Sequence, residues 1–126
     1  MAATRHFASR IIRALEESKI LGIRAGSQPH RFIGIWVVVV QGRVFVRSWD
    51  RKADGWYRTL RQEPRGVLQI AARELPVRAV HTRSERVKDA VDRAYAAKYT
   101  TPGAIKYVRG FKQAKRRATT TELVPA

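Results

Sequence analysis

Basic and aromatic side chains gather in one short segment near the middle of the chain. The segment contains Arg47, Ser48, Arg51, Lys52, Trp56 and Tyr57. Cationic and hydroxyl donors bind phosphate, and an aromatic ring can cover a planar heterocycle, so this segment suits a phosphorylated, flavin-like ligand. The alternative interpretation is a charged hairpin end whose aromatic rings complete the hydrophobic core.

Other residue types that could perform chemistry are sparse or badly spaced. The chain has no cysteine, and its three histidines, His6, His30 and His81, lack the spacing of a helical metal site. Glycine-rich phosphate loops and serine hydrolase signatures are absent. Acidic residues such as Glu85 and Asp89 alternate with basic ones, which is typical of a solvated helix face. The sequence therefore predicts neither a metal site nor a catalytic side chain.

The charge of the chain is strongly positive. Lysine and arginine number 26 against 10 aspartates and glutamates, which gives a formal net charge of +16. One cofactor phosphate needs only about two or three donors, so most of this charge must have another role. An acid-free run near the C-terminus makes non-specific nucleic-acid binding an alternative function. This run contains Lys106, Arg109, Lys112, Lys115, Arg116 and Arg117.

Length and hydropathy favour one globular unit. With 126 residues, of which 44% are hydrophobic, the sequence predicts a single domain over residues 1–126. The longest apolar run, residues 33–40, is too short for the span of about 20 residues that crosses a bilayer. We therefore expect no membrane association and a cytoplasmic location.

The pattern of apolar residues predicts the elements that must position the basic and aromatic segment. Helical spacing predicts an N-terminal helix within residues 1–18, with its apolar stripe over 4–18, and a second helix over 83–99. Strands are predicted at 19–25, 31–40, 43–49, 67–72, 77–81 and 118–124, and helical turns at 56–62 and 104–111.

One predicted hairpin joins residues 31–40 and 43–49 through a turn at Gln41-Gly42. Its first strand is apolar on both faces, so we expect it to be central in the sheet and covered on both sides. No parallel crossover unit is evident. The elements therefore predict an α+β barrel, mostly antiparallel, with an N-terminal helix and a late helix before a closing strand.

Residues 31–125 resemble the domain-of-unknown-function 2255 family, within the flavin-binding split-barrel superfamily of pyridoxamine-phosphate-oxidase-like proteins and deazaflavin-dependent nitroreductases. The resemblance lies in the segments 35–39 (IWVVV), 46–48 (VRS), 55–58 (GWYR), 92–99 (DRAYAAKY) and 118–125 (ATTTELVP). Residues 56–64 also resemble the segment of the deazaflavin reductases that lies beside the isoalloxazine. The resemblance implies a split β-barrel.

The resemblance also implies a cofactor, either FMN or a deazaflavin coenzyme. By this analogy Arg47, Ser48 and Lys52 bind the cofactor phosphate, and Trp56 and Tyr57 flank the ring. In the reductases, a loop between the first two strands also holds phosphate through a basic residue, a hydroxyl residue and a glycine. Here that region reads Arg24-Ala25-Gly26-Ser27, so Arg24 and Ser27 are candidates only after a rearrangement.

The late helix and the first long strand supply the remaining expectations. Tyr95 and Tyr99 are candidates for the substrate side of the site, although Tyr95 shares the apolar stripe of its helix, which favours a place in the core. Split barrels commonly form homodimers, with Ile33, Ile35 and Trp36 here as the candidates for partial burial between subunits. A cofactor-free barrel that acts through protein contacts is a further alternative.

Overall fold

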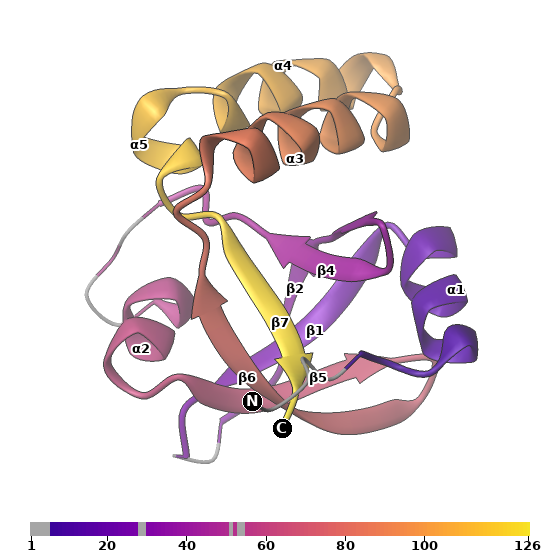
Figure 1. The fold of residues 1–126 in the computed structure, drawn as a ribbon, viewed down its shortest axis with the longest axis vertical. Coiled ribbons are helices and arrows are strands. Elements are labelled where there is room, and N and C mark those ends of the chain that lie inside the picture. Colours follow the sequence, from indigo (N-terminus) through magenta and orange to yellow (C-terminus); the bar gives the residue numbers. More distant parts are fainter. Residues whose placement is uncertain (1–5, 28–29, 51, 53–54) are drawn as a thin grey trace.

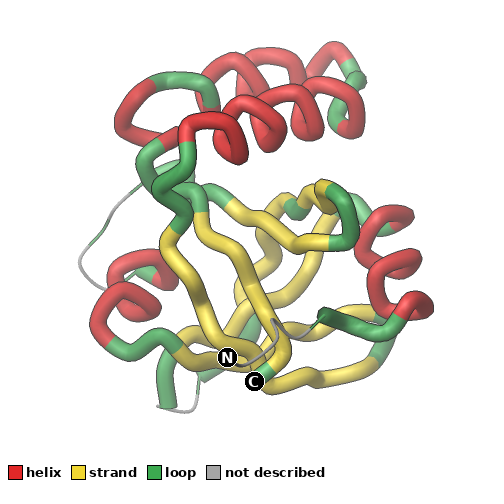
Figure 2. Tube along the Cα trace, in the orientation of Figure 1, coloured by secondary structure: helices red, strands yellow, loops and turns green. Residues whose placement is uncertain are grey.

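The structure is a computed structural model that describes residues 6–27, 30–50, 52 and 55–126. Within these residues the strands are β1 (Ile20–Ala25), β2 (Ile33–Trp36), β3 (Val38–Val40), β4 (Arg43–Val46), β5 (Arg65–Ile70), β6 (Arg73–His81) and β7 (Thr121–Pro125). The helices are α1 (Ser9–Glu17), α2 (Trp56–Gln62), α3 (Glu85–Lys98), α4 (Pro102–Phe111) and α5 (Ala114–Arg117). Figures 1 and 2 show the strands curled around a common interior, with the helices outside.

All these strands belong to one sheet that curls into a nearly closed barrel. Their order is β2-β1-β5-β6-β7-β4-β3, and each neighbouring pair is antiparallel. The two edge strands, β2 and β3, are consecutive in the sequence and are separated only by Val37. One continuous stretch therefore supplies both edges, because it leaves β1 at Val37 and then joins β4. The predicted α+β split barrel, mostly antiparallel, is confirmed.

The break at Val37 leaves backbone polar groups that side chains of α3 and the residue after it satisfy. The Tyr99 hydroxyl accepts a hydrogen bond from the Val37 N–H at 2.9 Å. The same hydroxyl has one hydrogen to donate, and two carbonyl oxygens lie within hydrogen-bond distance of its oxygen: that of Lys19 at 2.5 Å and that of Val37 at 3.0 Å. The Lys98 ammonium donates to the carbonyl oxygens of Val37 at 2.8 Å and Leu15 at 2.9 Å. These bonds stabilise the break, since an unpaired buried backbone group is costly.

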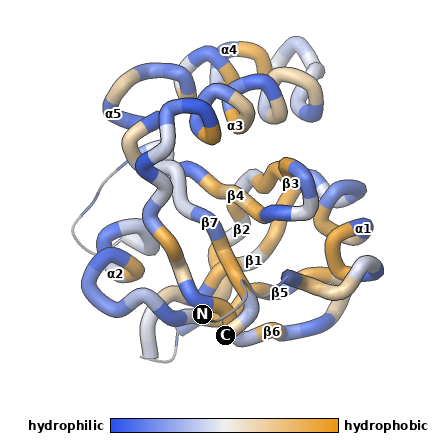
Figure 3. Tube along the Cα trace, viewed as in Figure 1, coloured by the Kyte–Doolittle hydropathy of each residue, from blue (hydrophilic) through white to orange (hydrophobic). Residues whose placement is uncertain are grey.

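Strand alternation fills the interior of the barrel. Leu21, Ile23 and Ala25 of β1 are buried, as the predicted period of two requires. Helix α1 packs against β3 and β5, while α2 packs against β1 and β6, and both add apolar side chains to this core. Figure 3 shows the hydrophobic residues concentrated on the strands and the hydrophilic ones on the outer helices.

A second apolar cluster joins α3 and α4 to the outside of the barrel. Val38 and Phe45 point outward from β3 and β4 and pack with Val91, Tyr95 and Phe111 of the two helices. Figure 1 shows α3, α4 and α5 together as one layer over this side of the barrel.

A buried arginine fastens this helical layer to the sheet. The Arg47 side chain, fully buried just beyond β4, donates from Nε to the Thr120 hydroxyl at 2.8 Å. Its Nη1 donates to the Asp92 carboxylate at 2.5 Å and to the Phe111 carbonyl oxygen at 3.0 Å. Its Nη2 donates to the Lys88 carbonyl oxygen at 3.0 Å. The guanidinium therefore connects the end of β4, Lys88 and Asp92 of α3, and the end of α4 with the segment before β7.

Three local expectations need correction. The predicted strand over 31–40 is not central: it divides at Val37 into the two edge strands, because the barrel closes there. Residues 73–76, which separate the predicted strands 67–72 and 77–81, are the start of β6, since the turn lies at Ala71 and Ala72, both with positive φ. Thr82 and Glu85 have the spacing of a capping box, but helix α3 is capped by Ser84, whose hydroxyl accepts from the Val87 N–H.

The ends of other elements also differ from the expected ones. Helix α1 begins at Ser9, whereas the predicted start at residue 4 lies outside the described residues. Residues 28 and 29, between the predicted strands 19–25 and 31–40, also lie outside them. The predicted helical turn at 104–111 is the longer helix α4, because Pro102 occupies its first turn, where proline is favoured.

The position of Lys98 predicts how stability depends on pH. Burial, and secondly the charge of Lys19, lower the pKa of Lys98 to about 8. Above pH 8 the Lys98 side chain therefore keeps its proton in the unfolded chain but loses it in the folded one. Because the unfolded chain binds more protons, the free energy of unfolding should rise with pH up to about 10. Beyond pH 10 the trend should reverse, because burial raises the pKa of Tyr99 to about 12.

Urea unfolding at pH 7.5 to 9.5 checks this prediction. Lys98→Gln keeps a hydrogen-bond donor but does not titrate, so it should lack the rise that the natural chain shows. Equal slopes for the two chains would show that Lys98 does not titrate in this range.

The Arg47 network predicts a large cost for removing its carboxylate. Asp92→Ala leaves a fully buried guanidinium without a counter-ion and should lower the free energy of unfolding by about 3–5 kcal/mol. Glu74→Ala is the matched control, because the Arg24–Glu74 pair is partly exposed and 3.8 Å apart, so its loss should cost less than about 1 kcal/mol. Chemical denaturation measures both, and similar losses would contradict the proposed role of Arg47.

Candidate functional site

A pocket of about 530 Å³ opens between β2, the segment that follows β4, the start of α2, and α4. All three tryptophans of the chain line it. Its aromatic wall consists of Trp36, Trp49, Trp56, Tyr107 and Phe111, and this hollow is called the aromatic pocket below. The other described lining residues are Ile33, Gly34, Ile35, Arg47, Ser48, Asp50, Lys52 and Gly55. Both its size and its largely apolar lining are typical of small-molecule sites.

The rings of this wall are held by contacts with one another. Trp36 stacks on Tyr99, with ring centroids 3.9 Å apart and planes 6° from parallel. Trp49 meets Tyr107 and Phe111 edge to face, at 5.0 and 5.5 Å. Such aromatic pairs keep the rings in fixed orientations, which favours recognition of a flat ligand.

The structure brings four of the predicted cofactor-binding residues to the aromatic pocket. Arg47, Ser48, Lys52 and Trp56 all line it, and Arg51 lies outside the described residues. Two of the four already have internal partners. The Arg47 guanidinium is bound by the helical layer, and the Ser48 hydroxyl donates to the carbonyl oxygen of Asp50. The exposed Lys52 side chain stays a candidate for contact with an anion, although the backbone N–H of Lys52 donates to the Asp50 carboxylate, which places a negative charge nearby.

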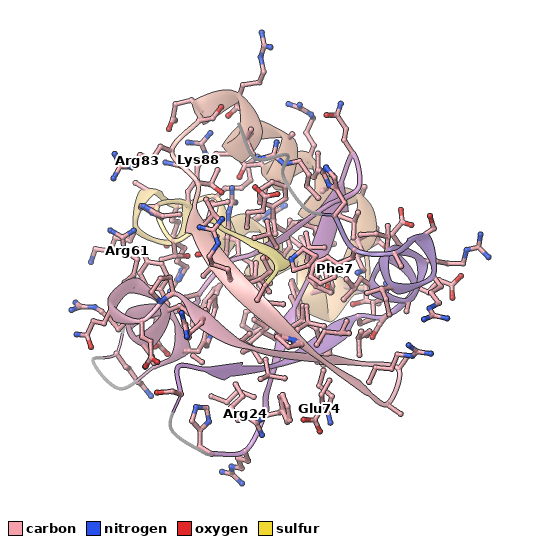
Figure 4. All side chains as sticks on the ribbon, turned by 60° about the horizontal axis from the view of Figure 1, so that its bottom comes forward. Phe7, Arg24, Arg61, Glu74, Arg83 and Lys88 are labelled. Atoms are coloured by element: carbon pink, nitrogen blue, oxygen red, sulfur yellow. The ribbon has the colours of Figure 1, made fainter. Side chains whose placement is uncertain are left out.

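The other predicted cofactor residues lie elsewhere. Tyr57 points away from the aromatic pocket and packs edge to face on His81, with centroids 6.5 Å apart. Arg24 lies on β1 next to Glu74, and Figure 4 shows these two side chains side by side. Ser27 lines a separate hollow of about 250 Å³, which among the described residues shares Ile33 and Trp56 with the aromatic pocket.

The two tyrosines predicted for the substrate side lie behind the aromatic wall. Tyr95 is buried and stacks on Phe111, with centroids 5.0 Å apart, and burial raises the pKa of its hydroxyl. Tyr99 is also buried and supports Trp36. The core interpretation of Tyr95 agrees with this placement, and Tyr99 reaches the pocket only through the ring that it supports.

Four aromatic residues of the wall were not among the predicted site residues: Trp36, Trp49, Tyr107 and Phe111. The signal for Trp49 was present, because it continues the alternating face of Phe45 and Arg47 beyond β4. The positions of Tyr107 and Phe111 depend on how α4 packs on the barrel, and this packing has no local signature in the sequence.

The C-terminal basic run divides into internal and exposed cations. Arg117 forms ion pairs with Glu85, Asp89 and Asp92 of α3. Hydrogen bonding to Arg117 is the main reason why the pKa of Glu85 is lowered. The exposed members are Lys106, Arg109, Lys112 and Lys115. Nucleic-acid binding through this surface stays a prediction.

Two further properties bear on partners and location. Ile33 is exposed and Trp36 half-buried at the open edge of β2, and the predicted homodimer through this edge stays a prediction. No helix in the described part of the chain is long and apolar enough to cross a membrane. Among the same residues, no group of three or more His, Cys, Asp or Glu is placed to hold a metal ion.

Comparison with known families identifies the family of this chain. A family described as "Uncharacterized protein conserved in bacteria", the domain-of-unknown-function 2255 family, matches residues 10–123. The chain belongs to this family, as the resemblance in its motifs predicted. A search of curated proteins found no match.

Solved structures share the fold. The conserved hypothetical protein Rv2991 from Mycobacterium tuberculosis is 16% identical with a TM-score of 0.59, and the match covers 100% of this chain and 83% of that one. A FAD-binding protein from Mesorhizobium loti is 12% identical with a TM-score of 0.59, and the match covers 99% of this chain and 94% of that one. These similarities support the barrel fold.

The contact between α4 and Trp49 predicts the effect of a small substitution. A methyl group on Gly110 would clash with the Trp49 ring, lying 2.6 Å from Cζ3 and closer still to Cη2. Gly110→Ala should therefore displace the indole, shift its fluorescence, and lower the free energy of unfolding by about 1–3 kcal/mol.

Gly103→Ala provides a control on the same helix. A methyl group on Gly103 would meet no atom within 4 Å, so the substitution should leave the fluorescence unchanged and stabilise the fold by about 0.4–1 kcal/mol. If Gly110→Ala behaved like this control, α4 would not hold Trp49 in the described position.

Proposed function

We propose that the aromatic pocket binds a flavin, or a deazaflavin with the same ring shape, and that the protein takes part in redox chemistry. The observation that carries this proposal is the convergence of all three tryptophans, with Tyr107 and Phe111, on one pocket of about 530 Å³. A similar fold in a FAD-binding protein adds support.

The residues of the pocket fit a flat tricyclic ring with one polar edge. Trp36 and Trp49 offer aromatic surface for stacking, and Phe111 closes the wall between them. Gly34 and Ile35 line the pocket from β2, which pairs only with β1 among the described strands. The other edge of β2 therefore offers backbone N–H and C=O groups to a polar ring edge.

The side chains would act by binding and placement. A bound flavin supplies hydride or electron transfer at its ring, so the protein needs no nucleophile of its own. The aromatic wall would orient the ring and exclude water from one face of it. Lys52, exposed at the rim, would place positive charge near the ligand. The Arg47 network would keep the wall in place, because it joins the segment that carries Trp49 to the end of α4.

Titration with FMN, FAD and a deazaflavin separately tests the proposal. Binding should quench tryptophan fluorescence, and a ligand at a hundred times its Kd should stabilise the fold by about 2.7 kcal/mol. Trp49→Leu should weaken binding about tenfold, within the range of aromatic stacking energies.

Tyr57→Leu is the control, because this ring belongs to α2 but lies outside the aromatic pocket. It should leave the affinity for the flavin unchanged. A loss of affinity equal to that of Trp49→Leu would show that Tyr57 belongs to the binding site. Absence of binding by every flavin would reject the proposal and favour the cofactor-free alternative.

A further inference from the structure

A second hollow, of about 480 Å³, adjoins the aromatic pocket and shares Trp49 and Tyr107 with it. Its other lining residues are Lys106, Arg109, Gly110, Gln113 and Arg116, all from α4 and α5 or the short connection between them. This hollow is called the basic pocket below. Because they line both pockets, the rings of Trp49 and Tyr107 are called the ridge below.

The cations of the basic pocket surround this ridge. The Arg116 guanidinium lies 3.5 Å from the centroid of the Trp49 ring, and its Nε donates to the Trp49 carbonyl oxygen at 2.8 Å. The Lys106 ammonium lies 5.1 Å from the centroid of the Tyr107 ring. Arg109 is exposed on the same helix. A ligand that lies across the ridge would therefore contact aromatic rings and cations together.

The charge of this pocket is not balanced by its own helices. Residues 102–121 contain no aspartate or glutamate. The carboxylates of the neighbouring α3 bind Arg117 and Arg47, neither of which lines the basic pocket. The local field at Lys106, Arg109 and Arg116 is therefore positive, and it favours a phosphate group.

The aromatic pocket has few groups left for a phosphate. The Arg47 guanidinium donates to four protein groups, and the Ser48 hydroxyl donates to the Asp50 carbonyl oxygen. The carboxylate of Asp50 also lines this pocket and would repel an anion. Lys52 at the rim is the remaining candidate cation of this pocket, whereas Lys106, Arg109 and Arg116 line the basic pocket. A ligand with both a flat ring and a phosphate would therefore find its ring contacts in one pocket and most of its cationic contacts in the other.

We infer that the basic pocket holds the phosphate-bearing tail of the ligand whose ring lies in the aromatic pocket. This inference rests on the proposed function for the identity of the ring, and it assigns to Lys106 and Arg109 the role predicted from the sequence for Arg47 and Ser48. It also explains part of the C-terminal basic run by phosphate binding, so that this part does not require nucleic-acid binding. The tail would cross between the pockets over Trp49 and Tyr107.

Comparing the affinities for riboflavin, FMN and FAD distinguishes the contacts of the ring from those of the phosphate-bearing tail. FMN and FAD should bind at least about tenfold more tightly than riboflavin, which has no phosphate, and added salt should narrow this difference. The double variant Lys106→Gln/Arg109→Gln should lose about tenfold or more in affinity for FMN and FAD, with unchanged affinity for riboflavin. Both substitutions are at exposed positions and should leave the fold intact.

Lys112→Gln/Lys115→Gln is the matched control. It removes the same charge from the same region, but neither residue lines the basic pocket. This variant should bind FMN almost as well as the natural chain. An equal loss in the two double variants would mean that only the long-range charge matters, and would overturn the inference. Equal affinity for riboflavin and FMN in the natural chain would overturn it as well.

Inorganic pyrophosphate tests the basic pocket without a flavin. Calorimetry should detect its binding to the natural chain, and Lys106→Gln/Arg109→Gln should abolish that binding. Pyrophosphate binding without any flavin binding would reject the proposed function but keep the phosphate subsite. Riboflavin binding without pyrophosphate binding would keep the proposed function and overturn the subsite.

Discussion

The burial of the Arg47 guanidinium is the constraint on which the arrangement of the helices depends. A buried charge is tolerated only when its hydrogen-bonding groups and its counter-ion are all supplied. Here they come from Asp92 and Lys88 on α3, Phe111 at the end of α4 and Thr120 before β7. These segments are far apart in the sequence, so satisfying one side chain positions the helical layer relative to the barrel.

The closing of the barrel is a second problem, and the same helix solves it. The strand that supplies both edges must break at Val37, and the break leaves polar groups in a buried place. Lys98 and Tyr99 satisfy them from the end of α3. The family segment 92–99 therefore binds Arg47 at its first residue and the break in the barrel at its last two. Architecture therefore explains three of its polar residues, Asp92, Lys98 and Tyr99.

The Arg47 network and the break at Val37 together position the wall of the aromatic pocket. Tyr99, held at the break, supports Trp36 on one side of the pocket, while the Arg47 network holds α4, which supplies Tyr107 and Phe111. This packing also separates two groups of cations: those paired with carboxylates of α3 and those without such a partner. The carboxylates of α3 bind Arg47 and Arg117, so the cations of α4 and α5 that face the ridge of Trp49 have no acidic neighbour on their own helices.

Local patterns in the sequence determined helices α1, α2 and α3, most of α4, most strands, the fold class and the association of Trp56 with the end of β4, because periodicity and turns depend on neighbouring residues. The short helix α5 was not predicted. The local patterns also identified Arg47 as important, but with a phosphate as its partner. Its observed partners come from segments 41 to 73 residues away, and only tertiary packing could place them there. The same reason applies to the pocket wall, since Trp36, Trp49 and Tyr107 meet only when the barrel closes at Val37 and α4 packs against it.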